Sequence, residues 1–178
     1  MKHIHYRDGI AHLFTTIDGN NKSLLLALAL CESESIATWE WFGKQCIKFG
    51  LGRYLSLPDS SVIGDRMKGI ERFIGQFPTV NHLSCFRHII DNIYRHTRGR
   101  VKGITVHDLW RLRNAKTFPE WYALFVKIGN VSFKMSEYIG ERIKPERVWR
   151  HELLSKKVVT FGRSTSQLAE SEMCWAHS

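Results

Sequence analysis

The sequence predicts an α/β fold with a helical segment inserted into it, and three observations favour this class. Two apolar runs flank a turn near the N-terminus, strand and helix patterns then alternate, and from about residue 105 apolar residues recur at helical spacing. With 178 residues, 43% of them hydrophobic, the chain is long enough to bury a sizeable core. No repeat or proline-rich linker divides it, which favours one domain with an insertion.

The N-terminal part is predicted to form an antiparallel hairpin. Apolar and β-branched residues fill positions 10–16 and 23–31, and the D-G-N-N segment at 18–21 tolerates the left-handed backbone of a tight turn. The leucine-rich run at 24–30 also has helical propensity. The turn before it and the polar residues after it nevertheless favour a buried strand.

Alternating helices and strands are predicted after the hairpin. The first helix is expected to begin at Ser35 or Thr38 and to end near Phe49. Its Trp39 and Trp41 are expected in the core. The following elements are a strand at 60–63, a helix at 66–74, a strand at 80–83 and a helix at 85–96. This order favours parallel strands beside the hairpin.

A helical segment is predicted for most of residues 105–155. Its aromatic residues recur at helical intervals, which favours core packing over the alternative of stacking on unpaired DNA bases. They are Trp110, Trp121, Tyr122, Phe125 and Trp149.

Positive charge is concentrated in the second half of the chain. Residues 87–163 hold 17 Lys and Arg against 7 Asp and Glu, a net charge of +10, whereas residues 1–86 hold 9 against 8. A surface of this sign neutralises phosphates and gains affinity by releasing counterions. The charge therefore predicts a nucleic-acid partner, and a solvated basic face without a partner is the alternative.

Neither a membrane segment nor a disulfide framework is expected. The apolar run at 24–30 is far shorter than the roughly 18 to 20 residues that span a bilayer, and the first residues lack the apolar core of a signal peptide. The four cysteines are widely spaced, with no C-x-x-C pair, so reduced thiols in an intracellular protein are expected.

Asp65 is a candidate metal ligand. It directly follows the predicted strand at 60–63, at the carboxyl end, where open α/β sheets place ligands and catalytic groups. A carboxylate there suits a hard divalent cation. The alternative is a helix N-cap, a position that Asp favours.

Cys85 and His88 form a C-x-x-H pair one helical turn apart, with His82 at similar spacing before them. Zinc accepts such ligands, but a fourth is not evident nearby, so zinc at Cys85 and His88 is not expected. The favoured interpretation is that the cysteine packs as a small hydrophobic residue and the histidine is satisfied by a neighbour. The pair remains a candidate auxiliary site.

Short motifs in a fixed order resemble those of Mutator-like element (MULE) transposases. The resemblance extends from about Tyr6 to Trp175. Its parts are S-E-S at 33–35 before W-E-W-F at 39–42, G-D-R-M-K-G at 64–69, F-P at 77–78, C-F-R-H-I at 85–89 and T-S-Q-L-A-E-S at 165–171.

This resemblance implies an RNase H-like DDE nuclease, in which three acidic residues hold two Mg²⁺ or Mn²⁺ ions for DNA cleavage and strand transfer. Asp65 matches the family's second acidic residue, and Glu170 matches the third. The family's first aspartate lies on a strand before the segment that residues 6–9 resemble, so the resemblance implies an N-terminally truncated core without it. Neither Asp8 nor Asp18 is expected to replace it.

The implied organisation has three parts. Residues 1–98 form a partial RNase H-like core, residues 99–160 form a basic helical insertion, and residues 161–178 form the C-terminal helix that carries the third acidic residue. The expected function is that of a transposase fragment, inactive in this truncated form. The alternatives are a transposase-derived, non-catalytic DNA-binding protein and a remnant reading frame without a selected role.

DNA is the expected partner, as transposon ends and target DNA, and a homo-oligomer is compatible with the family. Nuclear localisation follows from the resemblance alone. Arginine is well shaped to contact phosphate oxygens. The candidate DNA-binding residues are Arg87, Arg98, Arg100, Lys102 and Arg163.

Overall fold

The computed structural model describes residues 2–6, 9–17, 20, 22–57, 60–158 and 160. The protein is mixed α/β, with a three-stranded and a two-stranded sheet, which confirms the predicted class. It divides into two compact units. We call them the sheet unit, built on residues 1–83, and the helical unit, residues 84–164.

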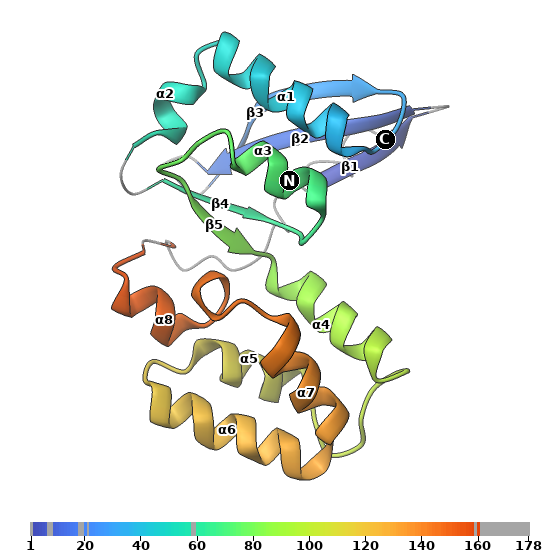
Figure 1. Ribbon diagram of the computed structural model, residues 1–178, viewed down its shortest axis with the longest axis vertical. Coiled ribbons are helices and arrows are strands. Elements are labelled where there is room, and N and C mark those ends of the chain that lie inside the picture. The colour runs from blue at the N-terminus through green and yellow to red at the C-terminus, as the bar shows by residue number, and fades with distance from the viewer. Residues whose placement is uncertain are drawn as a thin grey trace. The chain divides into compact units, whose positions relative to one another are not determined.

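Three antiparallel strands open the sheet unit (Figure 1). The hairpin of the second and third strands is the predicted one, with Leu13 opposite Leu28 and a bulge between Phe14 and Thr15. The first strand is an addition that the sequence pattern does not predict. In the order of the sheet the strands are β1 (Lys2–Tyr6), β2 (Gly9–Ile17) and β3 (Ser23–Cys31).

Helix α1 (Ile36–Lys48) packs on one face of this sheet (Figure 1). Ser35 Oγ accepts the Thr38 N–H and Thr38 Oγ1 accepts the Ser35 N–H, each at 3.1 Å. This reciprocal capping box satisfies two backbone donors at the start of the helix. Trp39 is fully buried and stacks on His12 of β2, with 3.9 Å between the ring centroids. The stacked pair joins the helix to the sheet.

Two expectations about the core are wrong. The run at 24–30 is a strand, but Leu28 and Leu30 are 52% and 62% exposed. They alternate with Ala29, which packs toward α1, so they lie on the opposite face of the strand, which is exposed. Trp41 is also exposed, because two residues along a helix rotate a side chain by about 200° away from the buried Trp39.

A strand, a helix and a second strand complete the sheet unit where the sequence predicts them. The Asn81 N–H donates to Ser60 O at 2.9 Å, which places the beginnings of the two strands side by side, as in a parallel pair. The helix packs against α1. These elements are β4 (Ser61–Gly64), α3 (Lys68–Ile74) and β5 (Asn81–Ser84), and a short helix, α2 (Gly52–Leu55), precedes them.

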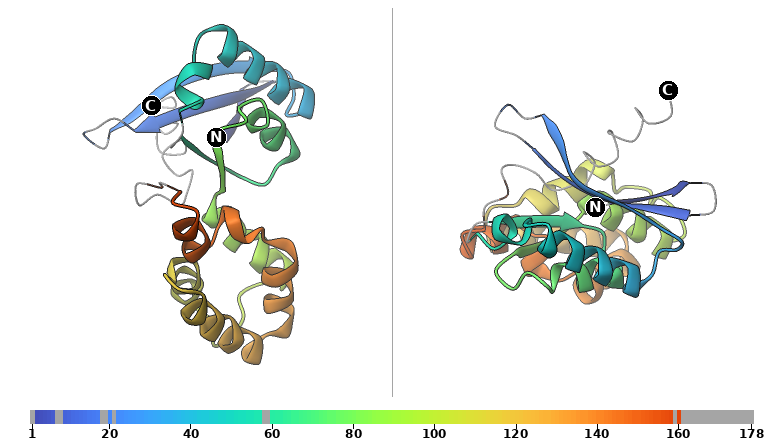
Figure 2. Two further views of the ribbon diagram at one scale, coloured as in Figure 1. Left: turned by 60° about the vertical axis from the view of Figure 1, so that its left-hand side comes forward. Right: turned by 90° about the horizontal axis from the view of Figure 1, so that it is seen from above.

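The helices of the helical unit surround a common centre (Figure 2), and one apolar cluster fills it. The cluster includes Phe86, Leu109, Met135 and Trp149, all almost fully buried. The predicted helical character of residues 105–155 is confirmed. The elements are α4 (Phe86–His96), α5 (Val106–Asn114), α6 (Phe118–Val131), α7 (Phe133–Arg142), the 3-10 turn η1 (Pro145–Arg147) and α8 (Arg150–Ser155).

The aromatic residues of this unit divide between core and surface. Trp149 is buried, as predicted, and Trp110, Trp121 and Phe125 are partly buried against the cluster. Tyr122 is 53% exposed, so the core-packing expectation is wrong for this residue. It lies on the solvent side of α6, away from the buried Ile128.

Candidate functional site

Asp65 lies at the carboxyl end of β4, directly after Gly64. Its Oδ1 accepts the Met67 N–H at 2.9 Å, and the residue is partly exposed. In the part of the chain that the structure describes, this is the one hydrogen bond of the Asp65 side chain. The carboxylate is thus oriented through one oxygen and keeps acceptor capacity for a cation or water.

Asp65 is not the N-cap of the following helix. The N-cap of α3 is Met67, which makes no side-chain capping bond. Asp65 instead bonds the backbone two residues further on, as in an Asx turn. This turn leads the chain from β4 into α3 and fixes the direction of the carboxylate.

Two glycines allow α3 to approach its neighbours closely. A Cβ on Gly64 would lie 2.7 Å from Ile70 Cγ2, and a Cβ on Gly69 would collide with the Trp39 ring. Trp39 cannot easily move, because it is fully buried between His12 and the aromatic side chains of the core. The start of α3, and with it the Asp65 turn, is therefore held against a rigid support.

Part of the predicted site lies outside the described residues. This is the case for Glu170 and Arg163, and also for Asp8 and Asp18. Within the described ranges, no three or more His, Cys, Asp and Glu side chains are grouped so that they could hold a metal ion. Asp65 is therefore the one predicted acidic ligand whose surroundings are known.

Cys85 and His88 lie at the start of α4. Cys85 is the N-cap residue, is almost completely buried, and forms no disulfide with another described cysteine. His88 lies in the first turn of the helix and is partly buried. The burial of Cys85 agrees with the predicted packing role, in which cysteine acts as a small hydrophobic residue.

Three of the predicted DNA contacts share one exposed turn. The basic loop, residues 97–105, follows α4 and displays Arg98, Arg100 and Lys102 to solvent. Arg98 and Gly99 have φ of +60° and +126°, and Thr97 Oγ1 closes the turn at 2.7 Å from Gly99 O. Residues 92–107 contain no Asp or Glu, so no acidic neighbour in sequence offsets these cations.

A buried arginine is a feature that the sequence interpretation missed. Arg113, in the last turn of α5, is only 6% exposed. Its Nη1 donates to Asn114 Oδ1 at 2.8 Å, and among the described residues no carboxylate oxygen lies within 4.0 Å of its guanidinium. Burial, and then the charge of Arg150, lower the pKa of Arg113 to about 10, so it remains a cation at neutral pH. The signal in the sequence is its spacing, four residues after the buried Leu109.

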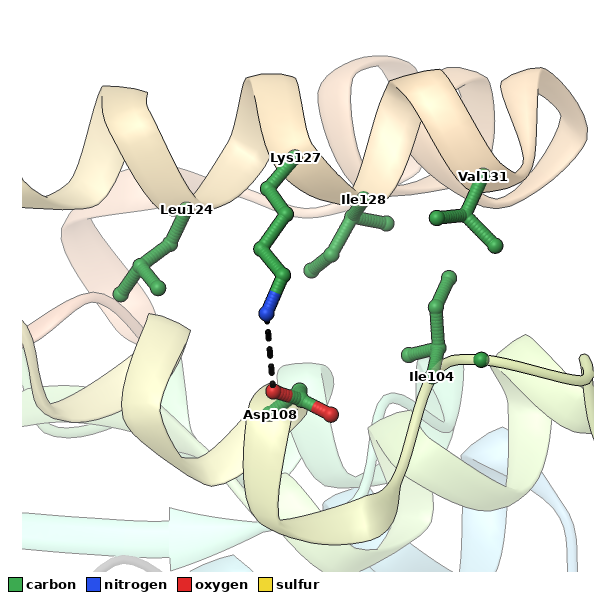
Figure 3. Close-up of a pocket in the computed structure, with 7 residues that line it drawn as sticks. Ile104, Asp108, Leu124, Lys127, Ile128 and Val131 are labelled. Carbon is green, nitrogen blue, oxygen red and sulfur yellow. Dashed lines mark ion pairs between the residues drawn. The ribbon is translucent and has the colours of Figure 1, made fainter.

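A small pocket between the start of α5 and helix α6 offers little chemistry (Figure 3). Leu124, Ile128 and Val131 line it from α6. Its two charged residues, Asp108 and Lys127, point toward one another and pair at 3.8 Å. The Asp108 carboxylate is also engaged by the hydroxyl and N–H of Thr105, which lower its pKa. These charges are occupied with each other, so the pocket is not a candidate ligand site.

The comparisons with known proteins address the first half of the chain. Residues 5–92 match the MULE transposase domain. This segment includes Asp65, Cys85, Arg87 and His88. No curated protein matches the chain. Among the described residues, no helix has both the length and the apolar character needed to cross a membrane.

Proposed function

The chain is a MULE transposase-like protein, and we propose that it acts on DNA through an RNase H-like DDE core in which Asp65 and Glu170 are metal-binding acidic residues. The match of residues 5–92 to a transposase domain is the observation that carries this proposal. The reaction would be cleavage and strand transfer. The substrates would be transposon ends and target DNA, and the protein would work in the nucleus.

The surroundings of Asp65 fit a ligand of Mg²⁺ or Mn²⁺. Both ions prefer hard oxygen donors, and Asp65 supplies a carboxylate that the Met67 N–H already orients. Bound ions of this kind stabilise the entering and leaving oxygens of a displacement at phosphorus. Glu170 would supply a second carboxylate. Asp65 would keep its position because α3 is fixed against Trp39.

The basic loop supports the DNA-binding part of the proposal. Its three cations lie in one turn, without an acidic residue nearby in sequence, on a segment of net charge +10. Such a surface binds phosphates without regard to sequence. Binding to duplex DNA should therefore weaken steeply as salt is added. In a plot of log K against log salt concentration, each neutralised phosphate contributes a slope of about −0.9.

A salt titration of duplex binding tests this proposal. Replacing Arg98, Arg100 and Lys102 together by Ala should reduce the slope of log K against log salt by up to about 2.7, since three phosphate contacts are lost. The matched control replaces Lys44, Lys48 and Arg53, which are exposed on α1 and α2 of the sheet unit. Equal slopes for the wild type and the loop variant would reject the loop as the DNA contact, and an affinity independent of salt would reject phosphate binding altogether.

A transposase-derived, non-catalytic DNA-binding protein is the second candidate. The basic loop favours it, because the loop binds phosphate without any contribution from Asp65. The two candidates differ in the role of Asp65. Duplex binding with no divalent-ion binding at Asp65 would support the second candidate over the first.

A further inference from the structure

Two arginines and two exposed aromatic rings lie at one junction of the helical unit. Arg113 is in the last turn of α5, and Arg150 is the first residue of α8, which packs against α5. A three-residue link, residues 115–117, connects α5 to α6. The first turns of α6, which carry Phe118 and Tyr122, therefore begin beside the end of α5.

Among the residues that the structure describes, neither arginine has a negative partner. Arg113 is almost fully removed from water, its one described hydrogen bond goes to the neutral Asn114, and the nearby charge of Arg150 repels it. A buried cation without a counter-charge is unfavourable unless an anion neutralises it. The acidic residue next to this junction, Glu152, lies 3.7 Å from His151, and no pairing with either arginine occurs within the described residues. A bound anion would neutralise the two cations.

The aromatic rings beside the arginines are open to solvent. Phe118 is 57% exposed, and its ring stacks on that of Tyr122 with 6.0 Å between centroids and 25° between planes. His151, adjacent to Arg150 in the chain, contacts the Phe118 ring edge-on at 5.9 Å. The Phe118 ring therefore contacts the first turn of α8, the helix that begins with Arg150. An exposed aromatic surface next to cations is the combination that binds single-stranded nucleic acid.

We infer that this junction binds one unpaired DNA nucleotide, with its phosphate at Arg113 and Arg150 and its base stacked on Phe118 and Tyr122. Guanidinium groups match phosphate oxygens in geometry and charge, and every base has a face that stacks on an aromatic ring. In a duplex the bases are already stacked, so this site distinguishes single strands from duplexes. The inference rests on the proposed DNA-acting function and adds a site for an unpaired strand.

Binding of a fluorescent oligo(dT) to the full chain tests the inference, with a duplex of equal length measured in parallel. Arg113→Met and Tyr122→Ala should each weaken oligo(dT) binding by about tenfold or more, while Tyr122→Ala leaves duplex binding unchanged. Two controls match them. Arg111→Met removes an exposed arginine of the same helix, and Phe133→Ala removes an exposed aromatic ring of α7. Both controls should remain within about twofold of the wild type.

Thermal melting separates a binding role of Arg113 from a structural one. If Arg113 serves an anion, Arg113→Met leaves the melting temperature unchanged or raises it and removes the stabilisation that oligo(dT) gives the wild type. If Arg113→Met unfolds the protein, the same oligo(dT) measurement is made on Arg150→Met, which should fold because Arg150 is only partly buried. Weaker oligo(dT) binding by Arg150→Met then supports the site, and unchanged binding overturns it.

The outcomes distinguish this inference from the proposed function. One outcome overturns the site and leaves the proposed function standing. In this outcome, substitution of Arg113, Arg150 or Tyr122 does not change oligo(dT) binding, and duplex binding remains salt-dependent. A loss of melting temperature in Arg113→Met without an effect on oligo(dT) binding shows that Arg113 neutralises another part of the protein. A chain that binds neither form of DNA contradicts both proposals.

Discussion

Replacing Gly69 by Ala should destabilise the sheet unit, although alanine is the better helix former. Gly69 lies in the first turn of α3, where an added Cβ would collide with Trp39 and come within 2.9 Å of its Cγ. Trp39 is fully buried and stacked on His12, so it has no free space to enter. Overpacking of this kind costs typically about 1–3 kcal/mol, and a rigid ring places this case at the upper end.

The gain in helix propensity only partly offsets that cost. Exchanging glycine for alanine in a helix gains at most about 1 kcal/mol. The net loss in the free energy of unfolding should therefore be about 2 kcal/mol, which lowers the melting temperature of a unit of this size by about 10 °C. Urea denaturation followed by tryptophan fluorescence measures it. The matched control is Gly52→Ala, because a Cβ there meets nothing closer than 3.6 Å and its backbone suits alanine. A Gly69→Ala variant as stable as this control would refute the close packing of α3 on Trp39.

Two further substitutions test the capping and titration of individual residues. Ser35→Ala removes the hydroxyl that accepts the Thr38 N–H and should destabilise the sheet unit by about 1 kcal/mol, measured by urea denaturation, with the exposed Ser33→Ala as a neutral control. Burial lowers the pKa of His151 below its ordinary value of 6.5, and Glu152 raises it only in part. The folded state thus favours the neutral imidazole, and stability falls as the pH drops through 6.5 toward the lower folded pKa. His151→Asn should remove this part of the acid sensitivity in melts between pH values of about 7.5 and 5.5, and an unchanged pH profile would contradict the shift.

The sequence predicts elements well where local signals agree with burial. The hairpin, helix α1 and the strand-helix-strand segment follow from turn residues, capping residues and apolar runs, and all three are found. Burial of individual side chains is less predictable. Leu28 looks like a core residue in an apolar run, but it lies on the face of β3 opposite Ala29, and the face that is buried is decided by the packing of α1 on the sheet.

The candidate site was predictable to a different degree in each unit. The position of Asp65 after a strand follows from the sequence, whereas its place before the helix, with Met67 as the N-cap, depends on where α3 begins. Arg113 could not be distinguished from the exposed Arg111 by composition or charge. The spacing of Arg113, four residues after Leu109, is the signal that places it on the buried face of α5, whereas Arg111 lies off that face.

Binding of Mn²⁺ to the chain, followed by the electron paramagnetic resonance signal of the free ion, tests the central claim most directly. Asp65→Asn keeps an Oδ1 that accepts the Met67 N–H, so it removes the negative charge while preserving the turn. The control is Asp91→Asn, an exposed aspartate on α4. If Asp65 and Glu170 hold a divalent ion, Asp65→Asn and Glu170→Gln should each weaken Mn²⁺ binding by at least about tenfold, whereas Asp91→Asn should have no effect. Equal Mn²⁺ binding by the wild type, Asp65→Asn and Glu170→Gln would contradict the assignment of these two residues as metal ligands.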